Sequence, residues 1–170
     1  MKEVLLSLLA PLRPGISPLH PAFLLSTWFG SGLMAKAPGT WGSLAALPFA
    51  WLIGRWGGAL ALLLAAAICA LVGWWAAAIY VRRTGADDPK EVVIDEVAGQ
   101  WLVLAAVPLD PLLFALGFVV FRILDIWKPW PASLADRAVG GGLGVMLDDL
   151  LAAVYGAAAL ALFSLWWSLP

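Results

Sequence analysis

Five carboxylates lie within or at the edge of strongly apolar segments, and they are the residues whose type and spacing could do chemistry. They are Asp95, Glu96, Asp125, Asp148 and Asp149. Arg122 and the boundary residue Lys128 are the two cations in the same segments. Because unpaired carboxylates in an apolar environment repel one another or take up protons, a surplus of acids indicates a bound cation. Oxygen ligands without a cysteine or a usable histidine favour a hard divalent ion, Mg²⁺ first.

The composition is that of a polytopic membrane protein. Of 170 residues, 63% are hydrophobic and 12% are charged, and the mean hydropathy is +0.93. These values lie far outside the range of soluble domains. The length suits one compact bundle, so we expect a single membrane-embedded domain over residues 1–170. A net charge of -1 gives no reason to expect nucleic acid as a partner.

Five apolar segments predict an all-α helical bundle, since only internally hydrogen-bonded backbone is stable in lipid. They cover residues 44–54, 59–81, 92–107, 111–127 and 142–166. The first segment is short for a crossing of about 20 residues and contains Pro48. It therefore either crosses with the help of Trp41–Ser43 or is re-entrant. Residues 1–27 are expected to form an interfacial N-terminal segment.

The basic residues predict the orientation of the bundle. If all five segments cross the membrane, eight lysines and arginines fall on one side and Arg55 alone falls on the other. The positive-inside rule makes the basic side cytoplasmic. The five acids then lie near the cytoplasmic ends of their segments, with Asp148 about 10 Å beyond the expected helix start at Gly142. That depth suits a lipid headgroup and not the middle of the bilayer.

The stretch GSGLMAKAPGTWGSL, residues 30–44, has the composition of a phosphate cradle. Its glycines and small polar residues lead into an apolar helix, whose free N–H groups and positive dipole end would face the cytoplasm. Lys36 adds a cation to this loop. The alternative, equally open on this segment alone, is an ordinary turn with Thr40 or Ser43 as the helix N-cap.

A second stretch, FRILDIWKPWPASLADR at residues 121–137, places cations beside an acid. Arg122, Asp125 and Lys128 recur every three residues, so they share one face of a helix end. A cation, an acid and a cation in line suit a phosphate with a metal beside it. The Asp-Arg pair at the end of the stretch is interpreted as solvated surface.

Together with VVIDEVAGQWL, residues 92–102, these stretches resemble the motifs of the phosphatidylglycerophosphatase A family in order and spacing. The resemblance runs from about Trp28 to Gly156, and residues 28–156 form the family-like core. It implies a Mg²⁺-dependent, multi-pass phosphatase of the bacterial inner membrane with its site facing the cytoplasm. The implied reaction removes the terminal phosphate of phosphatidylglycerophosphate to give phosphatidylglycerol. The implied partners are the phospholipid substrate and the bilayer, and the oligomeric state is left open.

The resemblance also implies roles for individual residues. The metal ligands would be Asp95, Glu96, Asp125, Asp148 and Asp149, and all of these except Asp95 would be catalytic. The phosphate-binding residues would be Arg122 and Lys128 and, more loosely, Lys36, Thr40 and Ser43. Because adjacent helical residues differ by about 100°, Asp148 and Asp149 cannot both face one metal. One is expected to bind it directly, and the other through water or by pairing with Arg122.

Three other interpretations compete with a phosphatase. A structural ion-pair network would join Arg122 to Asp125 and Lys128 to Asp95 or Glu96, but it leaves a surplus of acids. An ion-coupled transporter would use the acids as a relay near the middle of the membrane, in a repeated architecture of broken helices. A non-catalytic assembly subunit would use polar residues to join helices, and it too should carry no surplus of negative charge.

Overall fold

The computed structural model describes residues 12–167, and in this range the chain is entirely helical, without a strand. The all-α prediction is therefore confirmed. The first eleven and last three residues lie outside the described range. The predicted interfacial segment at residues 1–27 is described only from Leu12 onward, where it contains a short helix, α2 (Pro21–Ser26), before the 3-10 turn η1 (Ser31–Leu33).

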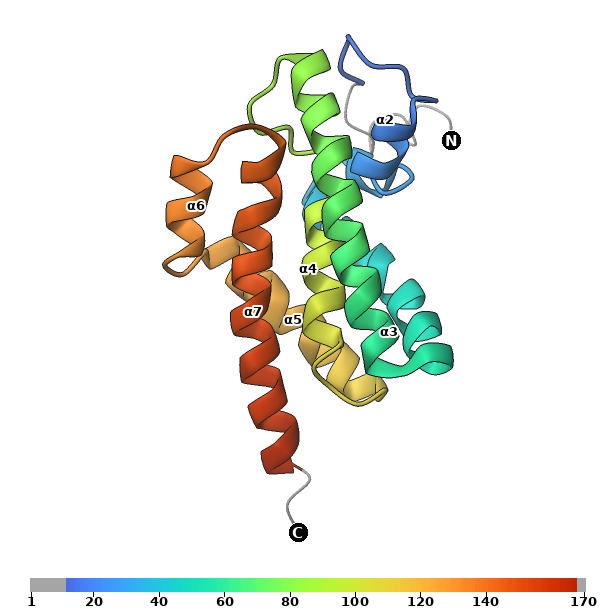
Figure 1. Ribbon diagram of the computed structural model, residues 1–170, viewed down its shortest axis with the longest axis vertical. Helices are drawn as coiled ribbons and strands as arrows, with labels where there is room; N and C mark the ends of the chain where they lie inside the picture. The colour runs from blue at the N-terminus through green and yellow to red at the C-terminus, as the bar shows by residue number, and fades with distance from the viewer. Residues whose placement is uncertain (1–11, 168–170) are drawn as a thin grey trace.

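The longest helical element, α3 (Pro38–Thr84), contains a break that divides it into two helices. At Gly58 the backbone adopts φ 70° and ψ −171°, a conformation that favours glycine. Figure 1 shows the chain reversing direction at this point. The first half begins at Pro38, six residues before the predicted start at residue 44, because proline at the first helical position is pre-organised for a helix.

Four helices follow α3. They are α4 (Ile94–Leu104), α5 (Pro111–Trp127), α6 (Ala132–Ala138) and α7 (Gly141–Trp167). The start of α5 is fixed by Asp110, whose carboxylate accepts hydrogen bonds from the N–H groups of Leu112 (2.8 Å) and Leu113 (3.0 Å). The sequence predicted a loop between α5 and α7, and the helix α6 within it was not expected.

The helix α4 is the centre of the bundle and packs against both α3 and α7. Two contacts fix its position: Val93 N–H donates to the Ser26 carbonyl at 2.8 Å, and the Trp101 indole N–H donates to the Ala46 carbonyl at 3.0 Å. Close packing depends on Gly99, because a Cβ atom there would collide with the ring of Phe121. The first turn of α4 is consequently held between the ends of the other helices (Figure 1).

Two helices are long and apolar enough to cross a membrane, by length and composition: Pro38–Thr84 and Gly141–Trp166. With 11 residues, α4 is about 16 Å long, well short of a hydrocarbon core of about 30 Å. The described helices thus include two candidate spans, and the crossing of all five predicted segments stays a prediction. On the outer surface of α3, large apolar side chains such as Leu64 and Ile68 are exposed, as expected for a lipid-facing surface.

Candidate active site

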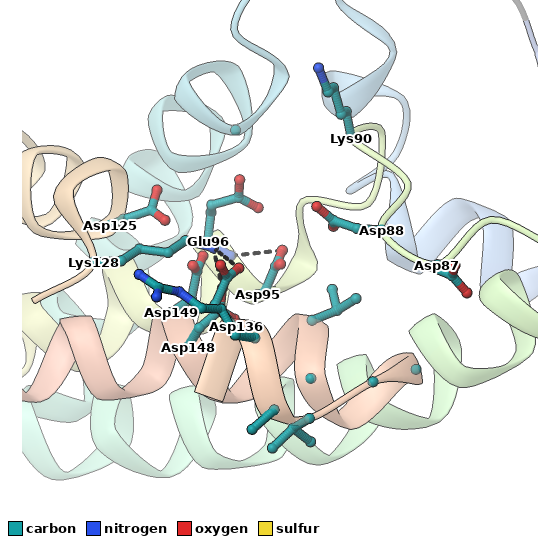
Figure 2. A pocket seen from close by; sticks show the side chains of 18 of the residues that line it. Asp87, Asp88, Lys90, Asp95, Glu96, Asp125, Lys128, Asp136, Asp148 and Asp149 are labelled. Atoms are coloured by element: carbon teal, nitrogen blue, oxygen red, sulfur yellow. Dashed lines mark hydrogen bonds and ion pairs between the residues drawn. The ribbon is translucent and has the colours of Figure 1, made fainter. Parts of the chain in front are cut away.

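A cavity of about 520 Å³ opens where the ends of several helices meet (Figure 2). Its walls come from the start of α3, the loop between α3 and α4, the first turn of α4, the end of α5, the helix α6 and the first turns of α7. The carboxylates that line it include all five acids singled out in the sequence: Asp95, Glu96, Asp125, Asp148 and Asp149. The structure therefore brings the predicted acids together from three helices that are distant in sequence.

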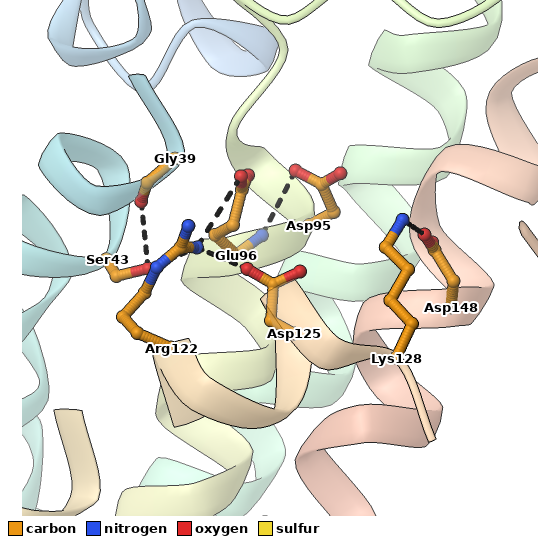
Figure 3. A network of polar contacts seen from close by, with 8 residues as sticks. All are labelled: Gly39, Ser43, Asp95, Glu96, Arg122, Asp125, Lys128 and Asp148. Atoms are coloured by element: carbon orange, nitrogen blue, oxygen red, sulfur yellow. Dashed lines mark hydrogen bonds and ion pairs between the residues drawn. The ribbon is translucent and has the colours of Figure 1, made fainter. Parts of the chain in front are cut away.

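Arg122 lies behind this acidic cluster and is not among the described residues that line the cavity. Its Nη1 atom forms an ion pair with Asp125, lies 3.8 Å from Glu96 Oε1 and donates to Ser43 Oγ at 3.4 Å (Figure 3). The side chain is only 14% exposed. Arg122 is thus placed to neutralise two of the acids from within the bundle, and the expected i, i+3 pair with Asp125 is present.

Close approach of Glu96 and Arg122 to the start of α3 depends on Gly39. A Cβ atom at this position would collide with Glu96 Oε1 and lie 3.1 Å from Arg122 Nη1. Ser43, one turn further along, donates its hydroxyl to the Gly39 carbonyl at 2.9 Å and is fully buried. Figure 3 shows this polar contact continuing from α3 through Arg122 to the acids. The backbone at the beginning of α3 is therefore part of the site.

Lys128 is the cation that faces the cavity from the end of α5. Its ammonium pairs with Asp148 and donates to Asp136 Oδ1 at 2.6 Å, so it does not pair with Asp95 or Glu96 as a structural network would require. Burial of the ammonium lowers the pKa of Lys128, but hydrogen bonds to Asp136 and Asp148 outweigh this effect and hold the pKa above its usual range. The hydrogen bond from Lys128 also holds the pKa of Asp136 below its usual range. Lys128 is therefore fully charged at neutral pH.

Asp95, Glu96 and Asp149 form a compact group in which, among the described residues, only Glu96 has a cation nearby, Arg122 at 3.8 Å. Asp95, Glu96 and Asp149 each offer one carboxylate oxygen, and these three atoms lie within 4.8 Å of one another. Glu96 Oε2 and Asp149 Oδ2 are buried without a hydrogen-bond partner among the described residues. Buried anions with unsatisfied oxygens at this spacing fit a hard divalent cation, for which carboxylate oxygens are the preferred ligands. The donor set thus agrees with the cation predicted from sequence.

The predicted phosphate cradle is only partly at the cavity. Pro38 and Gly39 line it, whereas Lys36 and Thr40 are not among the described lining residues and Ser43 is buried beneath them. The alternative of Thr40 or Ser43 as an N-cap is wrong, because the helix begins earlier, at Pro38, after Ala37, and has no side-chain cap. A helix start one turn earlier was not recognisable from the apolar pattern, since Gly39 and Thr40 are weak helix formers.

Several lining residues were missed in the sequence. Asp136 and Arg137, interpreted as solvated surface, lie on α6 and line the cavity, as do Asp88 and Lys90 from the loop between α3 and α4. A signal was available for Asp136, which lies in the same motif as Lys128 and carries the opposite charge. No comparable signal distinguished Lys90 from other basic loop residues.

Comparison with known proteins agrees with this geometry. The sequence model described as Phosphatidylglycerophosphatase A matches residues 24–164. The chain belongs to the phosphatidylglycerophosphatase A family. The matched range includes all five acids of the cavity together with Arg122, Lys128 and Arg137. The resemblance recognised from the motifs is therefore confirmed.

Relatives in this family match nearly the whole chain. A protein named Phosphatidylglycerophosphatase A from Escherichia coli (strain K12) is 41% identical over 152 residues, which cover 88% of this chain and 87% of the relative. Its namesake from Haemophilus influenzae is 38% identical, covering 89% and 93%. A putative phosphatidylinositol-3-phosphatase from Bacteroides thetaiotaomicron is also 38% identical, covering 84% and 91%. No solved structure matched the chain. Since relatives of equal identity carry different substrate names, identity alone does not assign the substrate.

Proposed function

We propose that this member of the phosphatidylglycerophosphatase A family hydrolyses the terminal phosphomonoester of phosphatidylglycerophosphate to phosphatidylglycerol, with Mg²⁺ as cofactor. The observation that carries the proposal is the group of Asp95, Glu96 and Asp149, three carboxylates that converge in a cavity and, among the described residues, have only Arg122 beside Glu96 as a cation. The family and the names of two relatives support the substrate. A relay transporter has no such support, because the acids lie at the ends of helices.

Asp95, Glu96 and Asp149 would hold the metal ion, with Asp125 beside them in the same cavity. When bound, Mg²⁺ would polarise the phosphoryl group and lower the pKa of an attacking water. Arg122 would orient the carboxylates of Asp125 and Glu96, since it contacts both and does not itself line the cavity. The phosphate-binding role predicted for Arg122 would require it to leave Asp125.

Lys90, Lys128 and Arg137 line the cavity and carry positive charge, so they are the side chains available to bind phosphate oxygens. A phosphate would compete with Asp136 and Asp148 for the Lys128 ammonium. In the reaction a water oxygen would bond to phosphorus while the bond to the glycerol oxygen breaks. Asp148 Oδ1, which has no partner among the described residues, would accept a hydrogen bond from the attacking water and orient it. The Lys128 ammonium would stabilise the negative charge that develops on the leaving oxygen, and the proton that the water gives up would reach that oxygen through solvent.

We further propose that the bundle lies in the bacterial cytoplasmic membrane with this cavity open to the cytoplasm. The cavity shares its end of the molecule with Arg82 and Arg83 at the end of α3, and Lys90 and Arg137 lie in its wall. A basic end of this kind is the cytoplasmic one under the positive-inside rule. The substrate would then reach the site from the inner leaflet.

Phosphate release by the purified full-length protein tests the proposal. The lipid substrate would be offered in detergent micelles with Mg²⁺ and, in parallel, with EDTA. Phosphatidylinositol 3-phosphate would be assayed beside it, because one relative bears the name of a phosphatase for that lipid. We expect Mg²⁺-dependent release from phosphatidylglycerophosphate. Release that continues undiminished in EDTA would contradict the metal, and preferential turnover of the inositol lipid would contradict the substrate.

A further inference from the structure

A second cavity, of about 460 Å³, lies between the end of α3 and the start of α7. Its walls are formed by Trp74, Trp75, Ala78, Val81 and Arg82 from α3 and by residues 141–142 of α7. Trp74 and Trp75 are about half exposed. All of the lining side chains except Arg82 are apolar or aromatic. We call this cavity the α3–α7 groove.

Arg82 is held over the apolar wall of the groove. Its Nε atom donates to the carbonyl of Ala78 at 3.1 Å, one turn back along α3, so the base of the guanidinium is held against the helix while the residue stays exposed. Within the part of the chain that the structure describes, no carboxylate forms an ion pair with Arg82, whereas Arg13 has one and Arg122 and Lys128 each have two. The groove therefore combines an apolar body with one uncompensated cation.

The groove adjoins the acidic cavity at Gly141, which lines both. Gly141 has φ 68°, and a Cβ atom at this position would meet nothing within 4 Å, so the space beside it is open. At the next residue, Gly142, a Cβ atom would collide with the backbone of Ala78, and α3 and α7 therefore touch directly there. At the start of α7, only the glycine backbone lies between the two cavities.

The charged end and the apolar part of the groove are arranged in the same order as the headgroup and the acyl chains of a phospholipid in the membrane. Arg82 lies in the last turn of α3, at the basic end of the molecule, and Trp74 lies eight residues earlier, about 12 Å deeper along the helix. An anionic group near Arg82 and an apolar chain extending past Val81 and Trp74 would fill it. Arginine binds phosphate well, and tryptophan is favoured at the membrane interface.

We propose that the α3–α7 groove binds the phosphodiester and the adjoining acyl chain of the phospholipid substrate, with Arg82 contacting the diester phosphate. The terminal phosphate then passes Gly141 into the acidic cavity. This inference rests on the proposed function, and it makes Arg82 a specificity-determining residue for lipids that carry both a diester and a terminal monoester. Phosphatidylglycerol has the diester and the acyl chains without the monoester, so it should occupy the groove and leave the acidic cavity empty.

Steady-state kinetics of the full-length protein provide the first test. In Arg82→Gln the KM for phosphatidylglycerophosphate should rise about tenfold or more, on the scale of a lost hydrogen bond to a charged group, while kcat changes less than twofold. Inhibition by phosphatidylglycerol should weaken by a similar factor. Arg82→Lys should restore part of both effects. Arg83→Gln is the matched control, because Arg83 is the next residue and does not line the groove.

Photo-crosslinking provides a second test that does not depend on turnover. Phosphatidylglycerol with a photoreactive acyl chain should label the peptide that contains Trp74 and Trp75, and unlabelled phosphatidylglycerol should suppress this labelling more than a zwitterionic phospholipid does. Labelling equally suppressed by both lipids would identify annular lipid only and overturn the proposal. Equal KM values for wild type, Arg82→Gln and Arg83→Gln would overturn it as well. A wild-type protein without phosphatase activity would instead refute the proposed function, and the crosslinking result would still decide the groove.

Discussion

Asp148 and Asp149 are neighbours on α7, but their carboxylates belong to two different sets. Asp148 pairs with Lys128, whereas Asp149 offers an oxygen to the group that contains Asp95 and Glu96. The separation follows from helix geometry, since consecutive side chains point about 100° apart. Two adjacent acids near the start of an apolar helix are thus stabilised in two ways, one by a cation of the protein and one by the ion that we propose for the site.

Substitution of these two residues should have unequal effects. Asp149→Asn removes a proposed direct ligand, so phosphate release should fall at least about a hundredfold, the scale for loss of a preorganised charge in a transition-state site. The activity of Asp148→Asn should fall less. Excess Mg²⁺ should restore part of the activity of Asp148→Asn and none of the activity of Asp149→Asn. Phosphate release measured against Mg²⁺ concentration checks both expectations.

A readout independent of activity accompanies this comparison. Mg²⁺ should raise the Tm of the wild type and of Asp148→Asn, because an ion that binds only the folded state stabilises it. It should leave the Tm of Asp149→Asn nearly unchanged. Near-normal turnover of both variants in EDTA would show that the acids are structural and that the proposed metal site is wrong.

Removal of Arg122 should lower the free energy of unfolding more than it weakens substrate binding. The Arg122 side chain is 14% exposed and pairs with Asp125, so Arg122→Ala leaves a buried carboxylate uncompensated, at a cost of about 3 to 5 kcal/mol. Arg122→Ala combined with Asp125→Asn should recover much of this loss, as measured by denaturant unfolding in detergent. If Arg122 binds phosphate instead, Arg122→Ala will raise KM with little change in unfolding free energy.

The sequence was sufficient to find the acids of the candidate site, because charge in an apolar segment is conspicuous. Asp95, Glu96, Asp125, Asp148 and Asp149 were all recognised, and all line one cavity. The helical class followed from the same apolar pattern. Both conclusions depend on local composition, which the sequence displays directly.

Partners within the site were harder to predict, because they depend on how the helix ends meet. Lys128 was expected beside a phosphate, and the structure shows that it also joins Asp148 to Asp136 on a helix that was predicted as loop. Arg122 was assigned to phosphate, and its contact with Ser43 on α3, 79 residues away, follows only from the tertiary packing. The early start of α3 was also missed, since proline and glycine at residues 38 and 39 weaken the helical pattern.

The orientation of the bundle can be tested with single cysteines in a Cys69→Ala background. Asp88 lines the acidic cavity and is exposed, so Asp88→Cys should react with a membrane-impermeant thiol reagent only when the cytoplasmic face is accessible. Trp56 is 83% exposed near the turn at Gly58, where the two halves of α3 meet, far from the basic end that carries Arg82 and Arg83, and Trp56→Cys should react from the periplasmic face. Intact cells and inverted vesicles separate the two faces. Labelling of Asp88→Cys in intact cells would contradict the proposed topology.

Finally, Gly39 should be required for activity although it carries no side chain. A Cβ atom there would collide with Glu96 Oε1 and crowd Arg122 Nη1, so Gly39→Ala should displace Glu96 from the group that it forms with Asp95 and Asp149. A displacement of about 1 Å in a catalytic site costs on the order of a hundredfold in rate, and we expect a loss of that size in phosphate release. Gly140→Ala is the matched control: Gly140 also lines the cavity, but a Cβ atom there meets nothing within 4 Å, so its activity should stay near that of the wild type. Equal activity of the two variants would show that Glu96 does not need its observed position, and the metal site would then have to be built from the other acids.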